Sequence, residues 1–191
     1  LCTITPVIAV PGLSADVLDR AGVRPAQVRA VLGASSAEDF SRFPQLQWVH
    51  SGAAGVDAWL ESRTLSEDVV LTSAAGNGAI PLAEHAMLLM LMLDRDVPRW
   101  LRAQGERRWD RYLHGELHGR TVGIVGLGNA GQDLARKAKA FGMRVRGLRR
   151  TNRAVPEVDH LHTQQTLHDM LRASDFVVVT APLTARTRGM F

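Results

Sequence analysis

The 191-residue sequence predicts an α/β protein in which short parallel strands alternate with helices. Three observations predict this class. Short runs rich in Val, Ile and Leu recur along the chain, helical repeats of apolar residues separate them, and one run ends in a glycine-rich turn that opens a helix. A hydrophobic content of 46% is sufficient for a packed core and excludes wholesale disorder.

Residues 1–80 are expected to alternate strands and helices. The strands are predicted over residues 7–10, 46–50 and 69–72, and helices are predicted after Ser14 and after Pro25. The apolar run at residues 86–93 is too short to cross a bilayer and predicts a buried helix, with Pro81 in its first turn. We expect this helix to divide the chain into a first domain portion, residues 1–80, and a second domain, residues 81–191.

The strongest pattern lies between residues 121 and 148. Gly126-x-Gly128-x-x-Gly131 alone is weak evidence, since the chain contains 17 glycines. Here, however, the pattern follows a β-branched run at residues 121–125 and precedes apolar residues at helical spacing. Gly142 stands where that helix should end in a left-handed conformation. The glycines therefore join a buried strand to a helix.

This strand–turn–helix arrangement is typical of dinucleotide binding. Gly126 allows the tight turn, Gly128 lets the backbone approach a pyrophosphate, and Gly131 lets the helix pack closely on the strand. The backbone N–H groups of Asn129 and Ala130, at the helix start, would bind the phosphates with help from the helix dipole. With a second strand at residues 143–148, the sequence predicts a Rossmann-type dinucleotide-binding domain.

The residues after the second strand favour NADP(H). An acidic residue at this place would accept hydrogen bonds from a ribose 2′-hydroxyl, whereas the sequence has Arg149 and Arg150, followed by Thr151. The two guanidinium groups could bind a 2′-phosphate. The alternative is that both arginines are solvated surface charges, which leaves NAD(H) possible.

Further motifs occur along the rest of the chain. These motifs are residues 47–57 (QWVHSGAAGVD), residues 81–85 (PLAEH), Trp109 with residues 117–120 (LHGR), and residues 173–184. In these motifs and in their order, the chain resembles the D-isomer-specific 2-hydroxyacid dehydrogenases, especially their glyoxylate and hydroxypyruvate reductase branch. The resemblance implies a flavodoxin-like α/β substrate-domain portion before the nucleotide domain. It also implies hydride transfer between NAD(P)H and a small 2-oxo acid, with glyoxylate or hydroxypyruvate as the expected substrate.

The resemblance assigns two further candidate sites. The backbone N–H groups of Ala54, Gly55 and Val56 would hold the substrate carboxylate, although the residues without the resemblance favour a simple tight turn. Pro182 would lie along the nicotinamide half of the cofactor, although it could merely terminate a strand. The loop at residues 76–78 could line the same cleft, act as a hinge, or only precede the helix.

The family's catalytic Arg, Glu and His lie downstream of its Pro-Leu-Thr segment, and this chain ends at Phe191, before all three. We therefore expect a truncated chain that carries no catalytic residue and is inactive alone. Counting strands at residues 121–125, 143–148 and around 175–181, we expect an incomplete sheet with the first of them at an exposed edge. Trp109 and Arg120 are interpreted as structural, with Trp109 closing the seam under the helix at residues 86–93.

Several function classes are disfavoured. The 23 Lys and Arg residues against 19 Asp and Glu are scattered, and aromatic residues make up 5%, so nucleic-acid binding is not expected. His160 and His162 lack accompanying Cys or acidic ligands, so no metal site is expected. A lone Cys2 and the absence of a secretory signal or membrane span favour the cytoplasm. The alternative function is a non-catalytic NAD(P)-binding sensor or corepressor-like protein, and the intact protein is expected to be a homodimer.

Overall fold

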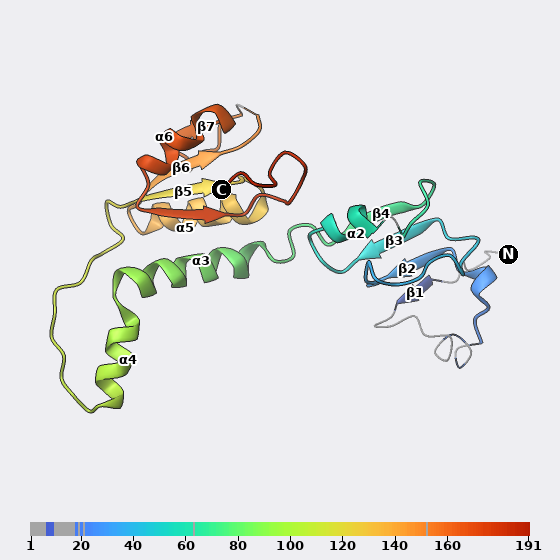
Figure 1. Cartoon of the computed structure of the whole chain (residues 1–191), viewed down its shortest axis with the longest axis horizontal. Coiled ribbons are helices and arrows are strands. Elements are labelled where there is room, and N and C mark those ends of the chain that lie inside the picture. Colours follow the sequence, from blue (N-terminus) through green and yellow to red (C-terminus); the bar gives the residue numbers. More distant parts are fainter. Residues whose placement is uncertain (1–6, 10–17, 19, 21, 63, 152) are drawn as a thin grey trace. The chain divides into compact units, whose positions relative to one another are not determined.

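The computed structural model describes residues 7–9, 18, 20, 22–62, 64–151 and 153–191. The chain forms two compact units, one of Leu1–Asn77 with Leu183–Phe191 and one of Gly78–Pro182. Each unit holds one parallel sheet with helices, which confirms the predicted α/β class (Figure 1). The division after Asn77 lies close to the boundary expected after residue 80, whereas residues 183–191 group with the first unit.

The first unit contains a parallel sheet in the order β1-β2-β3-β4. Its strands are β1 (Val7–Ala9), β2 (Ala30–Leu32), β3 (Trp48–Ser51) and β4 (Val70–Ser73), and α2 (Asp57–Ser62) follows β3. The helix expected after Pro25 is wrong: only the single 3₁₀ turn η1 (Pro25–Gln27) forms, because the next residues enter β2. Val28 and Val31 are fully buried there. Cys2, the end of the first predicted strand at Val10, and most of the helix expected after Ser14 lie outside the described residues.

The second unit contains a parallel sheet in the order β7-β6-β5-β8. The strands are β5 (Thr121–Val125), β6 (Arg144–Leu148), β7 (His160–His162) and β8 (Phe176–Val179). The Rossmann-type expectation is confirmed, but the count of three strands is wrong because β7 was missed. The expected exposed edge at residues 121–125 is also wrong, since β5 pairs with both β6 and β8 and all five of its residues are buried.

A charged cluster fixes the start of β5 beside the start of β8. Arg120, for which the sequence suggested no partner, lies 3.4 Å from a carboxylate oxygen of Asp94 and 3.3 Å from one of Asp175. The other Asp175 oxygen accepts the backbone N–H of Thr121 at 2.7 Å, which is the main reason that the pKa of Asp175 lies below its usual value. These contacts hold β8 next to β5.

The helices of the second unit are α3 (Ala79–Asp94), α4 (Val97–Gly105), α5 (Asn129–Ala140) and α6 (Leu167–Arg172), with the 3₁₀ turn η2 (Gln164–Thr166) before α6. α5 ends before Gly142, whose φ of 73° confirms the predicted left-handed glycine. Among the described residues, no helix is both long and apolar enough to span a bilayer.

α3 packs on α5 through one stripe of its surface (Figure 1). Ala83, Met87 and Met90 form that stripe and are buried in the core of the unit. The expectation of a buried helix is wrong for the remaining surface, since Leu88 is 50% and Leu93 73% exposed. Trp109 is 92% exposed, so it does not close a seam under α3.

Candidate functional site

The glycine-rich turn between β5 and α5 shows three different steric environments. Gly126 has a φ of 99°, and a Cβ there would lie 2.6 Å from the backbone nitrogen of Ala181. A Cβ on Gly131 would overlap the carbonyl oxygen of Gly126. By contrast, a Cβ on Gly128 would meet nothing within 4 Å. The turn is therefore tightly packed at its two ends and open at Gly128.

The open part of the turn coincides with the start of α5. Gly128 is the N-cap residue, and Asn129 and Ala130 are the first two residues of the helix. Among the hydrogen bonds of the described residues, none is donated by the backbone N–H of Leu127, Gly128, Asn129 or Ala130. Unpaired N–H groups at a helix start attract anions. The start of α5 therefore offers N–H donors and open space beside Gly128 for an anion.

Two side chains that the sequence did not single out contact the turn. The hydroxyl of Thr180, directly after β8, donates to the carbonyl oxygen of Gly126 at 2.6 Å. The side-chain amide of Gln132, in the first turn of α5, donates to the carbonyl oxygen of Leu127 at 2.9 Å. A sequence pattern of glycines gives no signal for either contact: Thr180 lies 54 positions from Gly126, and the Gln132 contact depends on the local course of the backbone through the turn.

The arginine segment lies next to the turn. Val125 and Leu148 are paired across β5 and β6, and Gly126 donates its N–H to the Leu148 carbonyl at 2.9 Å. Arg149 follows immediately, with its backbone N–H bonded to the His162 carbonyl at 3.2 Å. Its guanidinium donates to the carbonyl of Arg153 at 3.2 Å. Arg150 and Thr151 are exposed, so the segment presents two cations at the carboxyl end of the sheet.

Pro182 lies near the same edge of this sheet. It is exposed and follows Ala181, whose backbone packs against Gly126. The structure thus brings together the turn, the arginine segment and the segment after β8, as expected at the carboxyl ends of parallel strands.

The loop proposed to bind a carboxylate lies in the first unit, between β3 and α2. Ala54 and Gly55 are exposed, and Val56 is half-buried with its carbonyl accepting the first N–H bonds of α2. Among the described residues, no hydrogen bond is donated by the backbone N–H of these three residues. The side chain of Asn77 donates to the carbonyl of Gly52 at 3.2 Å and so fixes the loop from the segment before α3. The loop therefore has free donors on an anchored backbone.

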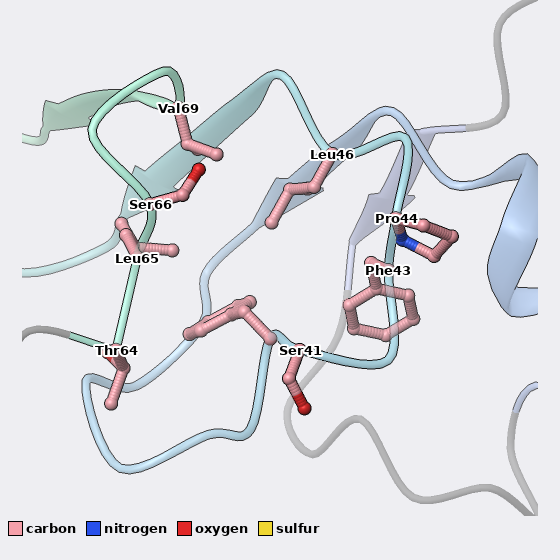
Figure 2. A pocket seen from close by; sticks show the side chains of 9 residues that line it. Ser41, Phe43, Pro44, Leu46, Thr64, Leu65, Ser66 and Val69 are labelled. Atoms are coloured by element: carbon pink, nitrogen blue, oxygen red, sulfur yellow. The ribbon is translucent and has the colours of Figure 1, made fainter.

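A separate hollow of about 390 Å³ lies elsewhere in the first unit. Figure 2 shows its side chains facing one another from two segments, one ending at Leu46 and the other at Val69. Both segments precede strands, β3 and β4, whereas the Ala54–Val56 loop follows the other end of β3. The hollow is thus at the opposite end of the sheet from the candidate carboxylate loop.

His160 and His162 lie on β7, but their surroundings differ from those of metal ligands. The guanidinium of Arg146 lies 3.2 Å from Nε2 of His162, and Nδ1 lies 3.2 Å from the Thr166 hydroxyl. Burial, and then the charge of Arg146, lower the pKa of His162. Within the described part of the chain, no group of three or more His, Cys, Asp or Glu side chains is arranged to hold a metal ion.

Comparison with known proteins decides the family. Residues 87–191 match the NAD-binding domain of D-isomer specific 2-hydroxyacid dehydrogenases. The chain belongs to the D-isomer specific 2-hydroxyacid dehydrogenase family. The matched residues lie mainly in the second unit and include its glycine-rich turn, which is of the kind that holds a nicotinamide dinucleotide.

Individual members of this dehydrogenase family resemble most of the chain. A glyoxylate reductase from Pyrococcus furiosus is 32% identical over 162 residues, covering 80% of this chain and 48% of that protein. The D-3-phosphoglycerate dehydrogenase from Bacillus subtilis is 30% identical over 155 residues, covering 79% of this chain and 29% of that protein. The chain thus spans less than half the length of these two relatives.

A solved structure has a similar fold. The NADPH-dependent glyoxylate/hydroxypyruvate reductase from Sinorhizobium meliloti, in complex with NADP and sulfate, matches with a TM-score of 0.80 and 30% identity. The match covers 98% of this chain and 65% of that one.

Proposed function

We propose that the protein containing this chain is an NADPH-dependent reductase of small 2-oxo acids, with glyoxylate or hydroxypyruvate as substrate. The observation that carries the proposal is the grouping of an open phosphate turn with two arginines at one edge of the NAD-binding sheet. The similarity to glyoxylate and hydroxypyruvate reductases supports this choice of substrate.

The turn is proposed to hold the cofactor diphosphate. The N–H groups of Asn129 and Ala130 would donate to the phosphate oxygens, and the absence of a side chain at Gly128 leaves room for them. Gly126 and Gly131 would act indirectly, because they allow β5, α5 and the segment after β8 to approach closely. Pro182, in that segment, is proposed to lie along the nicotinamide half.

The arginine segment is proposed to select NADP(H) over NAD(H). Arg149 is anchored at its backbone by β7 and at its guanidinium by the Arg153 carbonyl, which leaves most of its five N–H donors for a ligand. Arg150 and Thr151 add a second cation and a hydroxyl on the exposed side. A 2′-phosphate would be bound by charge-assisted hydrogen bonds here, and no acidic side chain at this position competes for the arginines.

The carboxylate of the 2-oxo acid is proposed to bind the loop at Ala54, Gly55 and Val56. Their three successive N–H groups have no acceptor among the described residues and would donate to the carboxylate oxygens. The dihydronicotinamide would supply the hydride that reduces the oxo group. No described side chain is assigned as proton donor for this step.

An intact protein of this kind is proposed to be a homodimer. The surface of α3 that does not pack on α5 exposes four leucines, Leu82, Leu88, Leu89 and Leu93, each at least 46% exposed. On α4, Trp100 and Leu101 are also exposed, at 41% and 60%. A second copy would cover a surface of this composition with the same residues from both subunits.

The reductase proposal is tested by turnover. The protein containing this chain is assayed with NADPH and three 2-oxo acids: glyoxylate, hydroxypyruvate and 3-phosphohydroxypyruvate, the acid that corresponds to D-3-phosphoglycerate. We expect the highest kcat/KM with glyoxylate or hydroxypyruvate. A preference for the phosphorylated acid would replace the proposed substrate, and tight NADPH binding without turnover of any of the three would favour the non-catalytic sensor.

A further inference from the structure

The phosphate turn contains two carbonyl groups that side chains hold in place. The Gly126 carbonyl accepts from the hydroxyl of Thr180 at 2.6 Å, and the Leu127 carbonyl accepts from the amide of Gln132 at 2.9 Å. In a trans peptide unit, the C=O of one residue and the N–H of the next point in opposite directions. The two contacts therefore also fix the directions of the Leu127 and Gly128 N–H groups.

The backbone of this turn needs such support. Gly126 and Gly128 flank Leu127, and glycine permits a wide range of φ and ψ, so the peptide units on either side of Leu127 could rotate. A rotated unit would turn a carbonyl oxygen, with its partial negative charge, toward the place where phosphates bind. That orientation would weaken binding of an anion, because N–H groups and not carbonyl groups attract it.

The two side chains are themselves well placed for this task. The backbone N–H of Thr180 donates to the Val125 carbonyl at 2.8 Å, which fixes the position of its hydroxyl next to the turn. Gln132 is held by α5 through its backbone bond to the Gly128 carbonyl at 2.9 Å. The residue between the two held carbonyl groups is fixed as well: Leu127 is 5% exposed and its side chain packs on Gly147, where a Cβ would lie 2.7 Å from it.

We propose that Thr180 and Gln132 are positioning residues for dinucleotide binding: they hold the carbonyl groups of Gly126 and Leu127 away from the diphosphate. This inference rests on the proposed role of the turn as the diphosphate site. The side chains act through the backbone, so their removal weakens the binding of ligands that carry the diphosphate and spares ligands that lack it.

Isosteric variants of the full chain test the proposal. Thr180→Val removes the hydroxyl and keeps the shape, Thr180→Ser keeps the hydroxyl, and Gln132→Met removes the amide. Gln45→Met, at an exposed glutamine of the first unit, is the matched control. Dissociation constants are measured for NADPH and for adenosine 2′-phosphate, which has no diphosphate. Hydrogen exchange of the turn amides is measured in the protein without ligand.

We expect Thr180→Val and Gln132→Met each to weaken NADPH binding about three- to tenfold, and the double variant about ten- to hundredfold. Thr180→Ser and Gln45→Met should bind NADPH within about twofold of wild type. Thr180→Ser keeps the hydroxyl that donates to the Gly126 carbonyl, and Gln45 lies outside the turn. Adenosine 2′-phosphate binding should not change. The Leu127 and Gly128 amides should exchange faster in the double variant without ligand.

Unchanged NADPH affinity in the double variant would overturn the proposal. An equal loss for NADPH and adenosine 2′-phosphate would also overturn it, because the side chains would then have a general structural role. Since Gln132 is exposed, Gln132→Met tests the idea even if Thr180→Val fails to fold. If the wild-type protein binds no dinucleotide, the proposed function itself fails, and this result differs from all of the others.

Discussion

The three glycines of the turn share a motif but meet different neighbours. Gly131 faces the Gly126 carbonyl and the Thr180 hydroxyl, and Gly126 faces the backbone of residues 180 and 181. Gly128 faces open space. The first two are therefore required by the folded chain itself, whereas the third is required only if a ligand occupies the space beside it.

Alanine substitutions at Gly128 and Gly131 should separate these requirements. Gly128→Ala should leave the melting temperature unchanged, since its φ of −79° suits alanine, but it should weaken NADPH binding about tenfold or more. Gly131→Ala should lower stability by about 1–3 kcal/mol, because backbone atoms cannot yield to the new methyl group. Thermal unfolding without ligand and an NADPH titration measure both effects. Wild-type NADPH affinity in Gly128→Ala would contradict the account.

At the residue scale, the sequence predicted what depends on neighbours along the chain. The order of strand, glycines and helix was readable because each signal is local, and the left-handed Gly142 was likewise confirmed. The contacts of Thr180, Gln132 and Asn77 were not readable. Thr180 lies 54 positions from Gly126, and Asn77 lies 25 positions from Gly52, so only the folded sheet shows that they meet.

At the scale of elements, the missed strand β7 changes the sheet most. Its sequence, His160-Leu161-His162, is short and polar at alternate positions, whereas a buried parallel strand is expected to be continuously apolar. β7 forms at the outer side of β6, where such a pattern is tolerated. The same miscount placed β5 at an edge, although the apolar β8 occupies that side. A strand count from apolar runs alone therefore misses a short border strand with polar residues at alternate positions.

His162 on β7 should make stability depend on pH. Arg146 only donates hydrogen bonds, so Nε2 of His162 accepts from it and the ring is neutral. Burial and Arg146 lower its pKa in the fold, and His160 acts in the same direction, whereas the Thr166 contact and Asp169 on α6 oppose the shift. The unfolded chain thus binds this proton more readily, and stability falls as pH drops below the ordinary pKa of 6.5.

The comparison with His162→Gln isolates this effect. Between pH 8 and pH 5.5, we expect the melting temperature of the wild-type protein to fall further than that of His162→Gln, which cannot take up the proton. Every other histidine is present in both proteins, so the comparison reports on His162 alone. Parallel pH profiles for the two proteins would show that His162 contributes nothing to the pH dependence.

At the scale of the whole molecule, each unit is a parallel sheet whose carboxyl edge carries the candidate contacts of that unit. The turn and the arginine segment follow strands of the second sheet, and the carboxylate loop follows β3 of the first. The predicted α/β class and family were thus sufficient to predict at which strand ends these candidate contacts lie. The exposure of α3 was not predictable, because an apolar helix has the same sequence pattern whether its core belongs to one chain or to two.

A substitution on the exposed surface of α3 tests the proposed homodimer. Leu93→Asp, at a side chain that is 73% exposed, should leave the isolated fold stable but introduce charges into an interface between copies. We expect sedimentation to show a dimer for the wild-type protein and a larger monomer fraction for the variant. Gln45→Asp, in the first unit, is the control and should remain dimeric. A monomeric wild-type protein would refute the dimer.

The most direct test of the central claim is a titration of the protein containing this chain with NADPH and with NADH. We expect NADPH to bind at least about tenfold more tightly, and Arg149→Asp to abolish or reverse this preference. Arg172→Asp, an equal change of charge on α6, should keep it. Equal affinity for the two dinucleotides, or an unchanged preference in Arg149→Asp, would contradict the assigned role of Arg149, and binding of neither dinucleotide would contradict the whole account.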